Sequence, residues 1–193
     1  ARRFRAVNVT IPYKALALAL CDEVSEEAKA IGAVNTVVNR GGRLFGYNTD
    51  FGGFRLLVRH RGVSLAGKTV LILGTGATQR TVRAVCTAEG AAQVLCASRS
   101  AKPGALRYEQ AAARQDVNVI INASPAGMYP NNGTCLVDLA APGAFPALEA
   151  VFDVVYNPLR TRLLQMAEAR GVPCAGGLLM LVAQAKYAAE LFL

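Results

Sequence analysis

The sequence has 193 residues, 53% of them apolar and 18% charged, with a formal net charge of +8. A chain of this length and apolar content can bury a core, which excludes a disordered protein. The length suits one large domain or two small ones. No window reaches the roughly 18 apolar residues of a membrane span. The apolar run at residues 15–20 is shorter than the about seven residues that a signal peptide needs. We therefore expect a soluble, cytoplasmic protein.

The positive charge and the cysteines narrow the choice of partners. Basic residues are dispersed and not interleaved with aromatic stacking platforms, so an anionic small ligand explains the charge as well as nucleic acid does. We expect neither a nucleic-acid nor a membrane partner. The cysteines are odd in number, scattered and without a Cys-x-x-Cys pair, which is typical of reduced thiols and predicts no metal site. They are Cys21, Cys86, Cys96, Cys135 and Cys174.

The first part of the chain predicts short strands and helices. Residues 7–11 alternate polar and apolar side chains and favour a strand that ends at Pro12, followed by a helix from Tyr13. A second helix is expected to begin after Ser25 as its cap and to end at Gly32.

A strand, turn and strand unit should follow at residues 33–39 and 44–47, joined by a glycine turn. The next predicted helix runs from Phe51 to Gly62, with Asp50 well placed as its N-cap.

From Lys68 onward, continuous apolar strands alternate with helical stretches, which is typical of a parallel sheet covered on both faces. The predicted strands are residues 69–73, 93–97, 117–123 and 151–155, and the predicted helices are residues 79–89, 159–170 and 178–193. The last helix is apolar and rich in alanine, so we expect it to pack on the first part of the chain.

A glycine-rich turn, Gly74 to Arg80, lies where the first of these strands gives way to a helix. Its first glycine permits the tight turn, and Gly76 lets backbone N–H groups approach a pyrophosphate at the helix N-terminus. The third glycine of the dinucleotide fingerprint is replaced by Gln79, so we expect looser packing of helix on strand. The alternative is a turn that needs glycine for structural reasons alone.

The end of the next strand selects the cofactor. An acidic residue there would bind the ribose hydroxyls of NAD, whereas an arginine accommodates the 2′-phosphate of NADP. The sequence has Ser98, Arg99 and Ser100, and no acidic residue occurs between Glu89 and Glu109. The prediction is NADP(H), with a solvated Arg99 as the alternative.

Six segments together resemble the shikimate dehydrogenase family and cover the chain in the family's order. They are NVTIPYK at residues 8–14, AVNT at 33–36, NTD at 48–50, NASPAGM at 122–128, DVVYNPL at 153–159 and MLVAQ at 180–184. The resemblance implies an NADP-dependent oxidoreductase that reduces 3-dehydroshikimate to shikimate in the chorismate route to aromatic amino acids. It also implies that an earlier segment with a carboxylate-binding serine pair is missing here, so that slow turnover is expected of this chain alone.

The resemblance assigns roles to individual residues. Lys14 and Asp50 would be the catalytic pair. Substrate would be bound by Thr10, Asn35, Tyr156 and Gln184, and the cofactor by Gly74, Thr75, Gly76, Ala77, Thr78, Ser98, Arg99, Ser100, Val154 and Gly177. Ketone reduction needs a positioned acid, and a lysine beside a carboxylate supplies one. Local structural roles are the alternatives: solvated Lys14, Asp50 as a cap, Asn35 in a turn, and Gln184 as a polar spot on a buried helix.

The expected fold is α/β, with a Rossmann NADP-binding domain at residues 63–177. Residues 1–62 and the helix at 178–193 would form a truncated α/β substrate-binding domain, with the active site between the two. A quinate or dual quinate/shikimate dehydrogenase and a non-catalytic NADP-binding protein are the alternative functions. A monomer and a homodimer are both compatible with the sequence.

Overall fold

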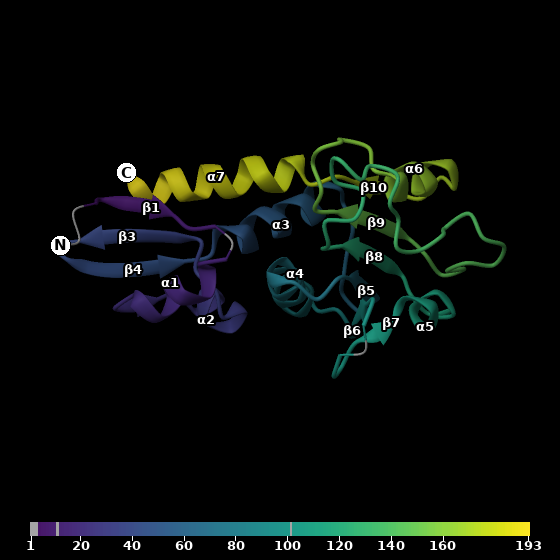
Figure 1. Ribbon diagram of the computed structural model, residues 1–193, viewed down its shortest axis with the longest axis horizontal. Coiled ribbons are helices and arrows are strands. Elements are labelled where there is room, and N and C mark those ends of the chain that lie inside the picture. Colours follow the sequence, from purple (N-terminus) through teal and green to yellow (C-terminus); the bar gives the residue numbers. More distant parts are fainter. Residues whose placement is uncertain (1–3, 11, 101) are drawn as a thin grey trace.

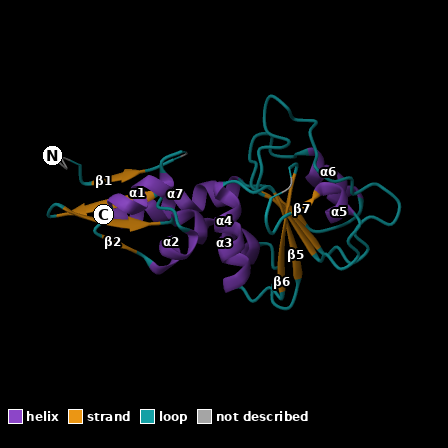
Figure 2. Cartoon of the chain, turned by 60° about the horizontal axis from the view of Figure 1, so that its bottom comes forward, coloured by secondary structure: helices purple, strands orange, loops and turns teal. Residues whose placement is uncertain are grey.

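The computed structural model describes residues 4–10, 12–100 and 102–193. It contains two sheets, one at each end of an elongated molecule, with helices α3 (Thr49–His60) and α4 (Ala77–Ala88) between them; helix α7 (Leu178–Phe192) runs from the middle alongside the smaller sheet (Figures 1 and 2). The α/β class predicted from the sequence is confirmed, and the sequence pattern predicted the strands of both sheets except for those of two residues. Within the described residues, no helix is both long and apolar enough to cross a membrane.

The smaller sheet has the order β1-β3-β4-β2. Its strands are β1 (Ala6–Asn8), β2 (Glu23–Val24), β3 (Thr36–Arg40) and β4 (Arg43–Tyr47), with helices α1 (Lys14–Leu20) and α2 (Glu26–Ile31) between β1 and β3 in the chain. Strands β1, β3 and β4 are antiparallel neighbours, and β2 pairs in parallel with β4. The predicted strand at residues 7–11 is shorter here, and its last residue, Ile11, lies outside the described residues. The strand predicted from residue 33 begins only at Thr36.

The larger sheet is entirely parallel and has the order β10-β9-β8-β5-β6-β7. Its strands are β5 (Thr69–Leu73), β6 (Gln93–Ser98), β7 (Leu106–Arg107), β8 (Val119–Asn122), β9 (Ala150–Asp153) and β10 (Cys174–Ala175). The first strand in the chain, β5, lies at the centre, and the order reverses between β5 and β8. This is the doubly wound Rossmann order, in which ligands bind at that switch point.

Both faces of the larger sheet are buried, which explains the unbroken apolar runs of its strands. Val70 and Ile72 of β5 pack with α3, α4 and α7, while Leu71 and Leu73 pack on the opposite face. Helices α5 (Tyr108–Ala112) and α6 (Arg162–Ala169) cover that second face together with the segment around Phe145. Alternate residues of one strand therefore serve two cores.

Helix α7 packs along α3, as expected for a last helix that returns to the first part of the chain (Figure 1). Two glycines of α3 allow the close crossing, because a Cβ at Gly53 would lie 2.7 Å from the carbonyl oxygen of Met180, and one at Gly52 would lie 2.9 Å from the Tyr187 ring. Helix α7 is not buried all round, since Leu181 and Val182 are exposed.

The N-cap of α3 is Asn48, not Asp50 as the sequence suggested. The Asn48 side chain accepts a hydrogen bond from Phe51 N at 3.3 Å and donates one to Ala33 O at 2.9 Å. An asparagine two residues earlier leaves the carboxylate of Asp50 available for another partner. Helix α6 is likewise capped by the Thr161 hydroxyl, so it begins later than the residue 159 that the sequence predicted.

Replacing Asn48 with alanine should lower the free energy of unfolding by about 2 kcal/mol, because it removes a cap and a second, buried hydrogen bond. Urea denaturation of the variant and the parent chain measures the difference. Asn132→Ala is the matched control, since Asn132 is exposed and such surface changes usually stay within about 0.5 kcal/mol. An equally small loss for Asn48→Ala would show that α3 does not depend on this cap.

Candidate active site

The larger of two neighbouring cavities, here called the glycine-loop cavity, has a volume of about 610 Å³ and opens at the switch point between β5 and β8. Gly74, Thr75 and Gly76 line it on one side, and Ser124, Pro125 and Ala126 line it on the other. Gly74 has a φ of +106°, and a Cβ there would lie 2.9 Å from the Cβ of Ser124. The turn therefore requires glycine both for its backbone conformation and for the close approach of the two loops.

The next glycine leaves the start of α4 open to a ligand. Gly76 is the N-cap residue of α4, no side chain caps the helix, and a Cβ at Gly76 would meet no atom within 4 Å. The N–H groups of the first turn are then free to bind an anion, which the helix dipole also favours. Gln79, in place of the third glycine, turns its amide toward β6 and donates to Cys96 Sγ at 3.0 Å.

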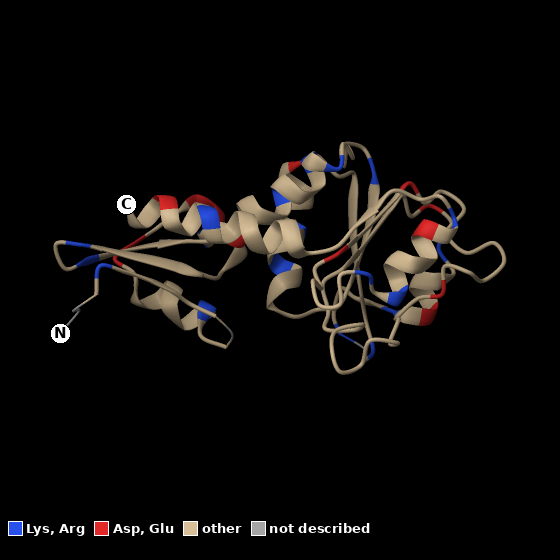
Figure 3. Cartoon of the chain, turned by 90° about the horizontal axis from the view of Figure 1, so that it is seen from above, with Lys and Arg blue, Asp and Glu red and all other residues tan. Residues whose placement is uncertain are grey.

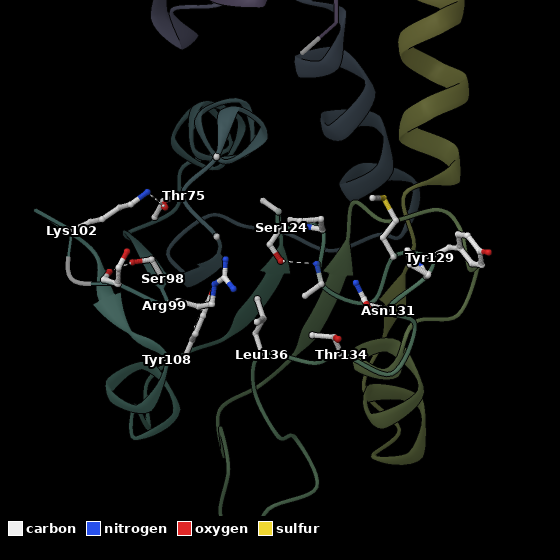
Figure 4. A pocket seen from close by; sticks show the side chains of 18 residues that line it. Thr75, Ser98, Arg99, Lys102, Tyr108, Ser124, Tyr129, Asn131, Thr134 and Leu136 are labelled. Carbon is white, nitrogen blue, oxygen red and sulfur yellow. Dashed lines mark hydrogen bonds between the residues drawn. The ribbon is translucent and has the colours of Figure 1, made fainter. Parts of the chain in front are cut away.

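Two cations border the same cavity beyond the end of β6 (Figure 4). Arg99 is exposed and extends beside Tyr108 toward the interior of the cavity. Lys102 donates a hydrogen bond from Nζ to the hydroxyl of Thr75 at 2.9 Å, and so reaches back to the glycine loop. Ser98 is buried and donates to Ser100 O at 2.5 Å, which shapes the turn that carries Arg99. Figure 3 shows that the other lysine and arginine residues are spread along the chain.

Several residues of this cavity, above all Lys102, are not predicted by the sequence motifs. The place of Lys102 in the sequence could have indicated a phosphate contact, since Lys102 is a second cation shortly after Arg99. Met128, Tyr129, Asn131 and Thr134 also line the cavity. They belong to an irregular segment after β8, for which no periodic pattern predicts a position.

The second cavity, here called the lysine cavity, has a volume of about 420 Å³. Lys14 and Asp50 line it and form an ion pair, with 2.6 Å between Lys14 Nζ and Asp50 Oδ2. Lys14 is the first residue of α1 and Asp50 lies in the first turn of α3. The structure thus brings together two residues 36 positions apart in the chain, each with a side chain about one fifth exposed.

All four residues that the resemblance assigns to substrate line the lysine cavity: Thr10, Asn35, Tyr156 and Gln184. Asn35 is buried, and its orientation is fixed, because its Oδ1 accepts from Thr49 N at 2.8 Å and its Nδ2 donates to Thr49 Oγ1 at 3.0 Å. Tyr156 is 47% exposed. Gln184 is half-buried, and its amide donates a hydrogen bond to Leu181 O at 3.0 Å. The alternative in which Gln184 is a polar spot on a buried helix is therefore wrong. Asn8 and Val9, which belong to the NVTIPYK segment but were assigned no role, line the cavity as well.

The residues assigned to the cofactor divide between the two cavities. Six of them line the glycine-loop cavity, whereas Thr78, Val154 and Gly177 line the lysine cavity. Ala77 is half-buried and is not among the described residues that line either one. The first turn of α4 therefore borders both cavities, through Gly76 on one side and Thr78 on the other. Gly177 allows a tight approach here, since a Cβ on it would lie 2.1 Å from Val154 O.

A carboxylate is buried at the same edge of the sheet. Asp153, the last residue of β9, has no exposed surface. Burial raises the pKa of Asp153 from its ordinary 3.8 to about 6, against the opposing effect of hydrogen bonds from Thr161, Val155 and Asn122. Cys135 is a titratable neighbour, and its pKa is also raised, first by its own burial.

This pKa makes stability depend on pH in a defined direction. Because the folded-state pKa of Asp153 is raised, its contribution to stability is complete below pH 3.8 and is lost as pH rises through about 6. In Asp153→Asn the contribution is absent at every pH, so the variant should gain about 3 kcal/mol relative to the parent between about pH 3.5 and about pH 7. Urea unfolding of both chains at several pH values measures this difference, and a constant difference would contradict the pKa.

The fold and the glycine loop at its switch point define a protein of the Rossmann class, which binds dinucleotides at that point. Residues 1–37 match the family model described as the shikimate dehydrogenase substrate binding domain. The NADP(+) shikimate dehydrogenase of Symbiobacterium thermophilum is 40% identical, over 95% of this chain and 69% of its own length. The chain belongs to the shikimate dehydrogenase family.

Two solved structures extend the comparison. The shikimate 5-dehydrogenase of Thermus thermophilus, in complex with NADP(H) and shikimate, is 36% identical and superposes with a TM-score of 0.85, over 99% of this chain and 74% of the other. The ligand-free 5-ketofructose reductase of a Gluconobacter strain is 31% identical, with a TM-score of 0.80, over 98% of this chain and 73% of the other. The same fold thus occurs under names that indicate different substrates.

Proposed function

We propose that the chain is a shikimate dehydrogenase, which reduces 3-dehydroshikimate to shikimate with NADPH and catalyses the reverse oxidation. The observation that carries the proposal is the Lys14–Asp50 ion pair in a cavity that shares the first turn of α4 with the glycine loop. Family membership supports the substrate, since relatives across the length of the chain are named for this reaction. The reaction would serve the chorismate route to aromatic amino acids.

The glycine-loop cavity fits NADP(H). The two glycines and the uncapped N-terminus of α4 would hold the pyrophosphate. Arg99 would hold the 2′-phosphate, and the exposed ammonium of Lys102 adds positive charge between the two phosphate positions. Thr78, Val154 and Gly177, on the side of the lysine cavity, would meet the nicotinamide end.

The chemistry divides between the cofactor and the chain. When bound, the reduced nicotinamide supplies the hydride that the carbonyl carbon of the substrate accepts. Lys14 then donates a proton from Nζ to the carbonyl oxygen, so that the ketone becomes a secondary alcohol. Before that transfer, the ammonium stabilises the negative charge that develops on this oxygen. Asp50 accepts a hydrogen bond from Lys14 and so fixes the direction in which the proton is offered.

The remaining polar groups of the lysine cavity suit a small carboxylate with several hydroxyls. Asn35 and Gln184 offer amides, and Thr10 and Tyr156 offer hydroxyls, so each can donate to or accept from a substrate hydroxyl or carboxylate. Because Thr49 fixes the Asn35 amide, its second N–H cannot rotate to suit a different ligand. These residues would orient the ring and leave only one carbonyl facing Lys14.

Domain organisation, location and assembly are part of the same proposal. Residues 1–62 with the helix at 178–193 would form the substrate domain, and residues 63–177 the NADP-binding domain. The division is supported by the sheets, because strands β1 to β4 fall in the first part and β5 to β10 in the second. Work in the cytoplasm is supported by Cys86, Cys96, Cys135 and Cys174, which form no disulfide. The chain would act as a monomer or a homodimer.

A single assay tests the proposed function. The purified chain is given NADP⁺ with shikimate, with quinate or with the reduced form of 5-ketofructose, and NADPH formation is followed by absorbance. We expect the highest kcat/KM for shikimate. A preference for quinate would replace the proposal with the quinate alternative, and NADPH binding without turnover of any substrate would favour a non-catalytic NADP-binding protein.

A further inference from the structure

Asp153 is a buried carboxylate that neither cavity uses. It has no exposed surface and is not among the described residues that line the glycine-loop or the lysine cavity. Burying a carboxylate is costly unless hydrogen bonds replace its water. Its partners therefore indicate what the group does.

Three donors point at its two oxygens. Oδ1 accepts from Val155 N and from Asn122 Nδ2, both at 2.9 Å, and Oδ2 accepts from Thr161 Oγ1 at 2.7 Å. An ionised carboxylate is an acceptor at both oxygens, whereas an asparagine would present one N–H₂ group to these donors. An asparagine could keep the two hydrogen bonds to Oδ1, but its amide nitrogen in place of Oδ2 would have to donate to the Thr161 hydroxyl, which reverses that hydrogen bond.

On one side, the network reaches the wall of the glycine-loop cavity. Asn122 donates to Ala126 O at 3.0 Å and accepts from Ser124 N at 3.1 Å and from Ser124 Oγ at 2.6 Å. Ser124 and Ala126 line the cavity opposite the glycine turn. The position of that wall is therefore set through Asn122, which Asp153 holds.

On the other side, the network holds both ends of residues 154–160. Val155 N is bound near the start of this loop and the Thr161 hydroxyl at its end. Between them lies Tyr156, which lines the lysine cavity together with Val154. Val155 O also accepts from Gly177 N at 3.0 Å, at the start of α7, the helix that carries Gln184.

We propose that Asp153 is a positioning residue. Through Asn122 and Thr161, it fixes the position of the Ser124–Ala126 wall relative to the loop of residues 154–160. The inference deepens the proposed function and rests on it, because hydride transfer requires cofactor and substrate to be held at a defined separation. Misplacement by about 1 Å can cost about 100-fold in rate. Asp153 needs no contact with either ligand to have this effect.

The test compares Thr161→Val with Thr161→Ser. Valine keeps the shape of threonine and removes the hydroxyl, whereas serine keeps the hydroxyl. We expect Thr161→Val to lower kcat with shikimate at least about tenfold, with a smaller change in KM, and Thr161→Ser to stay within about threefold of the parent. NADP⁺ and shikimate are saturating, and the temperature lies well below the unfolding midpoint of each variant.

The double variant Asp153→Asn/Thr161→Val separates positioning from a general loss of stability. If the two residues act through one hydrogen bond, the double variant should be no more than about threefold slower than the slower single variant. Multiplied losses would overturn the proposal. So would a normal kcat in Thr161→Val, or the same loss in Thr161→Ser.

Amide hydrogen exchange gives a readout that is independent of turnover. In Thr161→Val, we expect faster exchange at Ser124 and Ala126, which the Thr161 hydroxyl does not contact, as well as at Val155 near the start of the loop. If the parent chain oxidises no shikimate, the proposed function fails while the exchange result still decides the positioning role. Unchanged exchange at Ser124 and Ala126 would overturn it.

Discussion

Replacing Lys14 with methionine should lower kcat for shikimate oxidation by about 10²–10⁴-fold, the range that a positioned general acid or base contributes. Methionine keeps an unbranched chain of similar length and removes the ammonium that pairs with Asp50 at 2.6 Å. The amine that would take the proton of the substrate hydroxyl is then gone, and the carboxylate of Asp50 is left without its partner. Steady-state turnover at saturating NADP⁺ and shikimate measures the loss.

A binding measurement and a control variant show whether the loss is specific to the chemical step. The Kd for NADPH, followed by its fluorescence, should change by less than about threefold, since Lys14 lines the lysine cavity and not the cavity that holds the phosphates. Lys29→Met is the matched control, because Lys29 is exposed and paired with Glu26 on the surface of α2. Parent-like turnover in Lys14→Met would remove the lysine from the mechanism and, with it, the observation on which the proposed function rests.

Asp50→Asn should also lower kcat, but less than the loss of Lys14. The amide keeps an oxygen that can accept from Lys14 Nζ, and only the negative charge is removed. A charge-assisted hydrogen bond is about twice as strong as a neutral one, so the lysine is held less firmly and still offers its proton. A larger loss than in Lys14→Met would instead make Asp50 the main proton carrier.

The larger sheet was predictable because its residues follow simple periodic rules. The run from Thr69 to Leu73 is apolar after its first residue, and the structure buries alternate residues of this strand in two different cores. Short elements escaped prediction for the opposite reason. Strands β2, β7 and β10 have two residues each, too few for any period, and they exist because a neighbouring strand offers its hydrogen-bonding edge.

Helix starts show where local rules compete. Asn48 and Asp50 are both good caps, and tertiary contacts favour Asn48: its amide donates to the Ala33 carbonyl, while Asp50 pairs with Lys14. That carbonyl lies 15 residues earlier in the chain, so its position depends on the tertiary fold. Thr161 similarly sets the start of α6 because its hydroxyl is fixed by Asp153.

The sequence predicted which residues belong to the candidate site, but not how they are arranged in space. Motifs named Lys14, Asp50 and the glycine loop, yet nothing in the sequence gives a distance between residues 36 apart. The division of the cofactor residues between two cavities was also missed. At the start of α4, Gly76 lines one cavity and Thr78 the other, and the remaining residues divide because they lie on segments that are far apart in the chain.

Arg99→Glu should raise the Kd for NADPH by about 100-fold and the Kd for NADH by only a few-fold. The 2′-phosphate is the one group that distinguishes the two cofactors, and a charge-assisted hydrogen bond to it contributes about 1.5–3 kcal/mol. The glutamate also repels the 2′-phosphate, which weakens the binding of NADPH further. Screening by solvent limits the size of the effect, since Arg99 is exposed.

Lys102 makes the outcome informative in either direction. Its ammonium donates to Thr75 and lies on the same cavity, so it would keep part of the attraction for phosphate when Arg99 is lost. The double variant Arg99→Glu/Lys102→Ala should therefore bind NADPH no better than NADH. Arg162→Glu, which changes the net charge equally at an exposed position on α6, controls for long-range electrostatics. If Arg99→Glu weakened the binding of NADPH and of NADH by the same factor, Arg99 would contribute only to the overall positive potential of the cavity. The preference for NADP would then have to come from another residue.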